Sequence, residues 1–248
     1  MAGAITIAQG PIGGALPDRG DGGVSHRALQ TNMCSYTLGS MGPLQASLFD
    51  TDDVARLRPV GRQLEHVELG DGAWLDLRRE WLGRHDLLFD RLMGTVPWRA
   101  ERRRMYDRTV DVPRLVAFYE ESDPLPDPLL SEARQALSSH YVKRGFGPMA
   151  TTGLCLYRDG ADSVAWHGDT LGRQSRADTL VAIVSLGERR RFLLRPTSGG
   201  PSLRYDLGGG DLLVMGGSCQ RTWQHAVPKR AHARGPRISV QFRSAGVT

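Results

Sequence analysis

Residues 179–215 read TLVAIVSLGERRRFLLRPTSGGPSLRYDLGGGDLLVM, a succession of short apolar runs separated by turn residues. The first run, Thr179–Leu186, is rich in β-branched residues and has the length of a buried strand. Ser198–Gly200 and Gly208–Gly210 are turn signals, because glycine adopts backbone conformations that other residues avoid. This spacing favours consecutive strands joined by tight turns over strands that alternate with helices.

The same pattern of short apolar runs separated by turn residues extends in both directions from this stretch. About eight short strands within roughly 90 residues are typical of a β-sandwich or jelly roll. We therefore predict an α+β, mainly β fold whose β core covers about residues 150–245. The predicted strands are Leu154–Arg158, Ser163–His167, Thr179–Leu186, Arg191–Arg195, Leu203–Leu207, Asp211–Met215, Thr222–Ala226 and Arg237–Arg243.

Helical signals precede this β section. Asp86–Met93 carries apolar residues at helical spacing. A second helix is predicted to begin after the N-cap Asp127, with Pro128 in its first turn, and to end at Gly145. Between the start of the fold and these helices, Ala73–Leu77 alternates like a strand.

The N-terminal segment has a different composition from the rest of the chain. Residues 1–44 are rich in Gly, Ala, Ser and Thr and have no sustained period, so we predict a disordered tail before a single domain at residues 45–248. Gln45–Phe49 (QASLF) resembles the short peptide by which bacterial proteins dock onto the DNA sliding clamp. Leu48 and Phe49 are equally compatible with the first residues of the fold.

Composition narrows the functional classes. The 248 residues carry a formal net charge of +5, which favours an anionic partner such as nucleic acid, although codon bias also explains a preference for arginine. No apolar run approaches the ~20 residues of a membrane span, and the start of the chain lacks a secretory pattern. The three cysteines form no CxxC pair. We expect a cytoplasmic monomer that has no membrane partner.

Three side chains in the β section have the types and spacing of a metal site. His167 and Asp169 are two residues apart, so on a strand both point to the same face. Together with His225 they would form the two-histidine, one-carboxylate triad of non-haem iron(II) oxygenases, which leaves coordination positions open. A structural zinc site would usually take a fourth protein ligand. Each histidine alone is also compatible with a structural, hydrogen-bonded role.

Two arginines follow on the last predicted strand. Arg237 and Arg243 are six positions apart, an even offset, so they lie on one face of that strand. A dicarboxylate would offer one charged end to each guanidinium group. The alternative is an outer sheet face on which both arginines are solvated.

The order of these motifs resembles the AlkB family of iron(II)- and 2-oxoglutarate-dependent dioxygenases, especially the branch that acts on alkylated DNA and RNA. The similarity extends over residues 70–243. It implies a double-stranded β-helix, or jelly roll, with N-terminal helices and a nucleotide-recognition lid at about residues 95–119. The residues that carry the resemblance are Val96–Trp98, Pro113–Tyr119, Leu156–Arg158, Asp162–Asp169, Trp223–Lys229 and Arg237–Arg243.

The resemblance also implies roles for individual residues. His167, Asp169 and His225 would bind iron(II) and carry catalysis, with 2-oxoglutarate and O2 as cosubstrates. Tyr157 and Arg237 would bind the distal carboxylate of 2-oxoglutarate. The carboxylate next to the keto group would be bound by Arg243.

Several positions near this cosubstrate depart from the family pattern. Cys155 stands where the family usually has asparagine. Ser239 and Gln241 occupy the middle positions of the common Arg-x-Asn-x-Thr-x-Arg pattern. These changes remove amide hydrogen bonds worth about 1 kcal/mol each, so we predict weaker 2-oxoglutarate affinity without loss of binding. Relatives often have an acidic residue where Thr170 follows the metal motif, and this difference leaves the base preference open.

The reaction expected from the resemblance is oxidative dealkylation of bases such as 1-methyladenine and 3-methylcytosine, in DNA and also in RNA. The target base must be flipped or single-stranded to reach a buried metal. The alternatives are the same chemistry on a protein or small metabolite, and a non-catalytic nucleic-acid-binding module. Arg189–Arg191 fits strand-end solvation and phosphate contact equally well. Nucleic-acid contacts are expected at Trp98, Arg102, Arg103, Arg104, Tyr106, Arg114 and Trp166.

Overall fold

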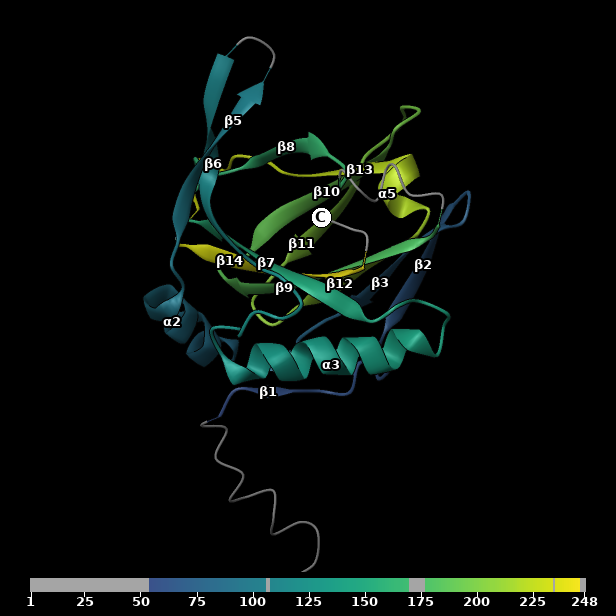
Figure 1. The fold of residues 1–248 in the computed structure, drawn as a ribbon. Coiled ribbons are helices and arrows are strands. Elements are labelled where there is room, and N and C mark those ends of the chain that lie inside the picture. Colours follow the sequence, from purple (N-terminus) through teal and green to yellow (C-terminus); the bar gives the residue numbers. More distant parts are fainter. Residues whose placement is uncertain (1–53, 106–107, 170–176, 234, 246–248) are drawn as a thin grey trace, which may run out of the picture. The chain divides into compact units, whose positions relative to one another are not determined.

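The computed structural model describes residues 54–105, 108–169, 177–233 and 235–245 (Figure 1). All of them belong to the second of two compact units, residues 48–248. The predicted tail, residues 1–44, and the clamp-like motif Gln45–Phe49 lie outside the described residues, so both stay predictions. No helix within the described ranges is long and apolar enough to cross a membrane.

The strands of the second half of the chain form two facing layers. Along the described chain, strands β7 to β14 alternate between an eight-stranded and a four-stranded sheet, except that β10 and β11 both belong to the four-stranded sheet. This is the arrangement of a jelly roll and confirms the predicted mainly β core. The large sheet contains β7 (Met149–Tyr157), β9 (Thr179–Gly187), β12 (Leu212–Gly217) and β14 (Arg237–Ser244), whereas the small sheet contains β8 (Val164–His167), β10 (Arg190–Pro196), β11 (Leu203–Leu207) and β13 (Trp223–Val227).

Four further strands extend the large sheet at its two edges. The hairpin of β2 (Glu65–Gly70) and β3 (Ala73–Arg78) pairs with β12 at one edge. At the other edge, β6 (Arg108–Tyr119) pairs with β7 and carries β5 (Arg99–Met105) as a hairpin that projects beyond the sheet (Figure 1). The segment predicted as a lid is therefore built largely of two antiparallel strands.

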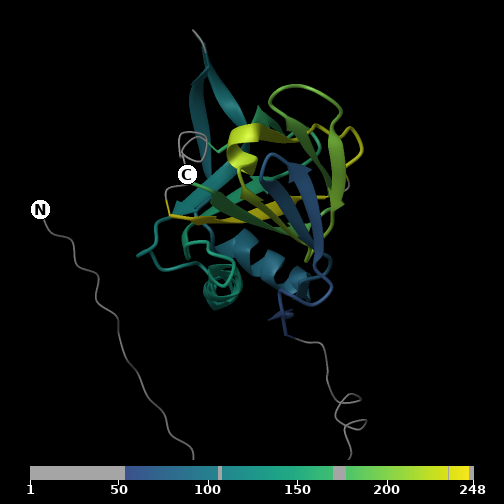
Figure 2. The same ribbon diagram turned by 90° about the vertical axis from the view of Figure 1, so that its right-hand side faces the viewer.

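The remaining elements are helical or very short. α2 (His85–Thr95) and α3 (Pro128–Val142) confirm the two predicted helices, and Asp127 caps α3 by accepting a 2.9 Å hydrogen bond from Leu129 N. Both helices lie on one side of the large sheet (Figure 2). β1 (Arg56–Leu57) pairs with β4 (Leu82–Gly83), and the short α5 (Cys219–Thr222) precedes β13.

Two hydrophobic cores follow from the alternation of side chains along the strands. Leu154 and Leu156 of β7 pack in a core with α2 and α3. Cys155 and Tyr157 point the opposite way, into a second core between the two sheets. The two candidate cosubstrate residues of β7 therefore face the space between the sheets.

Candidate active site

A cavity of about 900 Å³ opens between the two sheets. Its walls come from β7, β9 and β14 of the large sheet, from β8, β10 and β13 of the small sheet, and from the β5–β6 hairpin. The three predicted metal ligands and all five predicted cosubstrate residues line this cavity. These residues are His167, Asp169 and His225, with Cys155, Tyr157, Arg237, Ser239 and Arg243.

The two histidines are neighbours because their strands pair. His225 of β13 lies opposite His167 of β8, and their ring centroids are 4.2 Å apart. Burial, together with the neighbouring His167, lowers the pKa of His225 to about 3, so its imidazole is neutral. Burial likewise lowers the pKa of His167, whose Nδ1 donates to the Ala165 carbonyl oxygen at 2.9 Å. That bond leaves the Nε2 lone pair of His167 available to a metal.

Asp169 lies two residues beyond His167 and is almost fully buried. Burial acts to raise its pKa, but the positive charge of Arg243 more than offsets this, and the pKa falls below its ordinary value. Arg243 Nη2 lies 3.4 Å from Asp169 Oδ1, while the buried Oδ2 has no hydrogen-bond partner among the described residues. Gln220 of α5 fixes the backbone by accepting a 3.1 Å hydrogen bond from Asp169 N.

The donor set suits a divalent transition metal. It supplies two neutral imidazoles and an ionised carboxylate that has one buried oxygen without a partner. In the described ranges no three His, Cys, Asp or Glu side chains are arranged to hold an ion as they stand.

Arg237 is a cavity residue whose side chain suits a carboxylate ligand. Arg237 is 1% exposed, its Nε donates to Ser185 Oγ at 2.8 Å, and its guanidinium carbon lies 5.1 Å from the centroid of the Tyr157 ring. Within the described chain its buried Nη1 has no acceptor. A buried guanidinium with an unused donor requires an anionic or polar ligand, and a carboxylate supplies one.

Gly153 creates the space for the second predicted cosubstrate arginine. A Cβ atom at Gly153 would lie 2.8 Å from Arg243 Nη1. Position 153 is paired with Gln241 across β7 and β14, so the glycine sits directly beneath these side chains. The end of a flexible side chain, rather than backbone, would have to move to accommodate an alanine here.

We therefore expect Gly153→Ala to weaken 2-oxoglutarate binding by roughly tenfold, because Arg243 is displaced while the fold is retained. Calorimetric titration of 2-oxoglutarate into the Mn(II)-loaded protein measures this change. Gly94→Ala on α2 is the matched control, since a Cβ there meets nothing within 4 Å. Equal affinities for the two variants would contradict the steric argument.

The residues predicted to contact nucleic acid lie in different surroundings, and their role stays a prediction. Arg114 of β6 lies inside the cavity, with its Nε 3.3 Å from Cys155 Sγ. Trp98 packs against the core beside the helices. Trp166 lies under Arg195, 4.2 Å from ring centroid to guanidinium carbon, and does not line the cavity. The side chains of Arg102, Arg103 and Arg104, and the whole of Tyr106, lie outside the described residues.

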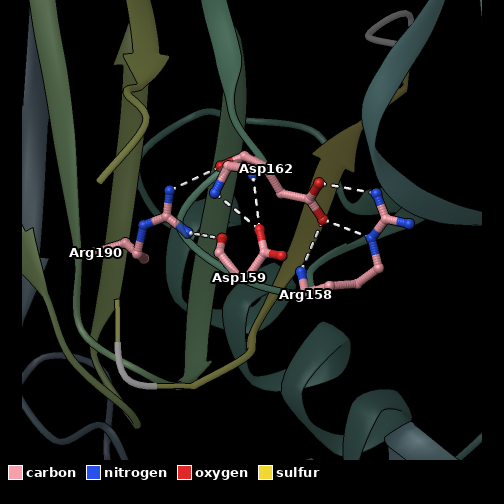
Figure 3. Close-up of polar contacts among 5 residues, drawn as sticks. Arg158, Asp159, Asp162 and Arg190 are labelled. Atoms are coloured by element: carbon pink, nitrogen blue, oxygen red, sulfur yellow. Dashed lines mark hydrogen bonds and ion pairs between the residues drawn. The ribbon is translucent and has the colours of Figure 1, made fainter. Parts of the chain in front are cut away.

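Arg190 is a buried structural residue of β10, next to the cavity-lining part of that strand. It is 1% exposed and donates to the carbonyl oxygens of Asp159, Asp162 and Pro228 at 2.9, 2.8 and 3.0 Å. Figure 3 shows it beside the Arg158–Asp162 ion pair, which closes the loop between β7 and β8. The loop leads directly into the strand that carries His167, so Arg190 helps to fix the position of that strand. Because Arg190 is buried and bound to backbone carbonyl oxygens, neither strand-end solvation nor phosphate contact describes its role within the Arg189–Arg191 run.

Sequence reasoning missed several residues of the site. Ser185 holds Arg237, and Phe192 stacks on His225 with ring centroids 5.4 Å apart. Phe118 also lines the cavity, with 47% of its surface exposed. Phe118 lies on the same face of β6 as Arg114 and Val116, because alternate residues of a strand share a face. That face could be recognised as the cavity side only once the pairing of β6 was known.

Comparison with known proteins identifies related oxygenases. The family model described as the 2OG-Fe(II) oxygenase superfamily matches residues 84–243. The Bos taurus protein "Alpha-ketoglutarate-dependent dioxygenase alkB homolog 3" is 33% identical over 180 residues, which cover 64% of this chain and 61% of the relative. The match therefore spans about three fifths of that protein's length.

Other relatives carry related names. "DNA oxidative demethylase ALKBH2" of Arabidopsis thaliana is 28% identical over 224 residues, 71% of this chain and 68% of the relative. A solved structure, "The structure of OsALKBH1", aligns with a TM-score of 0.49 and 16% identity over 73% of this chain and 100% of that chain. The chain belongs to the AlkB family of the 2OG-Fe(II) oxygenase superfamily, whose cofactor is iron(II) and whose cosubstrates are 2-oxoglutarate and O2.

Proposed function

We propose that this protein oxidatively removes alkyl groups from nucleic-acid bases, with DNA as the main substrate and RNA as a further one. The observation that carries the proposal is the single cavity in which His167, Asp169 and His225 lie beside buried arginines. The names of its relatives, an alkB homolog 3 and a DNA oxidative demethylase, support the choice of nucleic acid as substrate.

His167, Asp169 and His225 would hold iron(II) in this proposal. The bound iron would activate O2 at the expense of 2-oxoglutarate, which is oxidised to succinate and CO2. The chain itself keeps both imidazoles neutral through burial and orients His167 through the Ala165 carbonyl. Phe192 closes one side of the site by stacking on His225, which limits the access of water.

The cosubstrate would lie between Arg237 and Arg243. Arg237, with Tyr157 beneath its guanidinium group, would bind the distal carboxylate. Burial raises the pKa of Tyr157, so its phenol stays protonated and is able to donate a hydrogen bond. Arg243 would bind the carboxylate next to the keto group. In that position it would release Asp169 to the metal.

The β5–β6 hairpin would act as the nucleotide-recognition lid. Its sequence between Arg99 and Tyr119 is rich in arginine, which suits contact with phosphates. A base stacked inside a duplex could not reach a metal held within the cavity, so the target base must leave the stack or lie in a single strand. Bases that cannot pair, such as 1-methyladenine and 3-methylcytosine, cost least to extrude.

The exposed ring of Phe118 would stack on the incoming base. We expect Phe118→Ala to raise the KM for a methylated oligonucleotide by roughly tenfold, the contribution of one base–aromatic stack. The affinity for 2-oxoglutarate should stay unchanged. Steady-state kinetics on single strands measures the effect, with Val142→Ala on α3, 52% exposed and remote from the cavity, as control. An unchanged KM would remove Phe118 from the substrate surface.

Formaldehyde release tests the function directly. Single-stranded oligonucleotides that carry 1-methyladenine or 3-methylcytosine should yield formaldehyde with iron(II) and 2-oxoglutarate, and none when 2-oxoglutarate is left out. An unmodified strand is the negative substrate. If 2-oxoglutarate binds but no methylated strand is bound or demethylated at low salt, the substrate is a protein or small metabolite and the proposal fails.

A further inference from the structure

The cosubstrate pocket contains an amide at a position where the family pattern has threonine. Sequence comparison predicted that Cys155 and Ser239 remove amide hydrogen bonds from this region. The structure places the side chain of Gln241 in the same cavity, where its Nε2 lies 3.6 Å from Cys155 Sγ. An amide therefore approaches position 155 from the neighbouring strand, β14, rather than from β7.

The other end of this amide holds Arg243. Gln241 Oε1 accepts a short hydrogen bond from Arg243 Nη2, the same atom that lies 3.4 Å from Asp169 Oδ1. Arg243 is largely buried, with 11% of its side chain exposed, and its Nε has no partner in the described chain. Gln241 and Asp169 thus both lie next to the same guanidinium nitrogen of Arg243. A neutral acceptor at 241 holds the guanidinium group without cancelling its charge.

The register of β14 and β7 explains how small residues on β7 make room for the side chains of Gln241 and Arg243. Gln241 pairs with Gly153, and Ser239 pairs with Cys155, across β14 and β7. Residues 239, 241 and 243 share the face that lines the cavity. The missing side chain at Gly153 leaves room for both Arg243 and Gln241, whose Oε1 would be 3.6 Å from a Cβ there. The small thiol of Cys155 leaves the adjoining room for the amide nitrogen.

We propose that Gln241 is the positioning residue of Arg243 and replaces, from β14, the amide that position 155 lacks. The inference rests on the proposed assignment of Arg243 to the carboxylate next to the keto group. Gln241 holds the guanidinium group in the cavity, where it can meet a carboxylate of the cosubstrate. The predicted loss of affinity from Cys155 and Ser239 is thereby offset within this chain.

Direct binding tests the proposal without turnover. The dissociation constant of 2-oxoglutarate is measured by titration calorimetry on the full chain loaded with Mn(II). Gln241→Thr should weaken binding about tenfold, the factor that one charge-assisted hydrogen bond supplies. Gln241→Glu should weaken it at least as much, because the added charge pairs with Arg243. Gln135→Thr, the same change at an exposed position of α3, should bind like the unaltered protein.

Rescue separates positioning from general damage to the pocket. Since Cys155 Sγ lies next to the Gln241 amide, an asparagine at 155 reaches the space that Gln241→Thr vacates. The double variant Cys155→Asn/Gln241→Thr should recover affinity to within about threefold of the unaltered protein. Failure of a folded double variant to recover, or unchanged binding by Gln241→Thr, would overturn the proposal. Should the double variant not fold, the comparison of Gln241→Thr and Gln241→Glu with Gln135→Thr decides.

The binding results for the Gln241 variants can be told apart from a failure of the proposed dealkylation function. If all variants bind 2-oxoglutarate as the unaltered protein does, Gln241 has no positioning role and the dealkylation proposal is untouched. If the binding pattern follows the prediction but methylated strands give no formaldehyde, the positioning role stands and the substrate class is wrong. If the unaltered Mn(II)-loaded protein binds no 2-oxoglutarate, both proposals fail.

Discussion

His225→Ala is expected to reduce 2-oxoglutarate turnover at least about thousandfold, because the proposed metal site would lose one of its two imidazoles. His225 is 7% exposed and lies between His167 and Phe192, so no neighbouring donor of the described chain is placed to take over. Succinate formation measures turnover. Calorimetric titration with Mn(II) measures the accompanying loss of metal affinity, which should occur without any substrate.

The control for this variant is another histidine. His232 is exposed and outside the cavity, so His232→Ala should leave both succinate formation and Mn(II) affinity unchanged. Circular dichroism of both variants checks that the β core is retained. If His225→Ala bound Mn(II) and formed succinate as the unaltered protein does, the assignment of the metal ligands would be wrong.

The sequence predicted the β core well because its pattern is local. Each run after Gly153 is bounded by turn residues, and each became a strand with ends shifted by a few residues. The helix behind Asp127 was likewise fixed by a cap and a proline, although it ends at Val142, earlier than the predicted Gly145. These features depend on neighbouring residues alone, so they were visible before any tertiary contact was known.

The faces of the strands were harder to predict, because they depend on pairing between distant segments. Arg114 points into the cavity since β6 pairs with β7 in a register that places Val116 opposite Cys155. A shift of one residue would have turned Arg114 outward. Trp166 is a different case. His167 was predicted to point to the metal, and strand alternation alone turns the adjacent Trp166 to the other face.

Arg189, Arg190 and Arg191 show the limit of reasoning from residue type. Nothing in the run distinguishes its middle member, yet Arg191 is half exposed beside Asp206 and Arg190 is buried. The difference arises from the register of β10, in which Arg190 pairs with Leu207 and turns inward. The carbonyl oxygens that accept hydrogen bonds from Arg190 belong to two separate loops, so no local sequence pattern could predict that Arg190 is buried.

Arg190→Met is therefore expected to lower the free energy of unfolding by roughly 3–5 kcal/mol, the usual cost of removing one partner from a buried, charged hydrogen-bond network. Methionine fills much of the volume but leaves three carbonyl oxygens without their donor. Urea unfolding followed by circular dichroism measures the loss. Arg191→Met, on the exposed face beside Asp206 at 4.0 Å, should cost less than about 1 kcal/mol.

The same pair of variants separates a structural arginine from a phosphate-binding one. If Arg190 contacted nucleic acid, its replacement would weaken oligonucleotide binding and reduce the salt dependence of that binding, with little change in stability. The geometry predicts the opposite for Arg190→Met, a large loss of stability with little direct effect on oligonucleotide binding. Arg190 also lies 5.5 Å from the Tyr157 ring centroid, so the destabilised loop should loosen the cosubstrate end of the cavity. Arg190→Met should then lose 2-oxoglutarate affinity in step with stability, whereas Arg191→Met should lose neither.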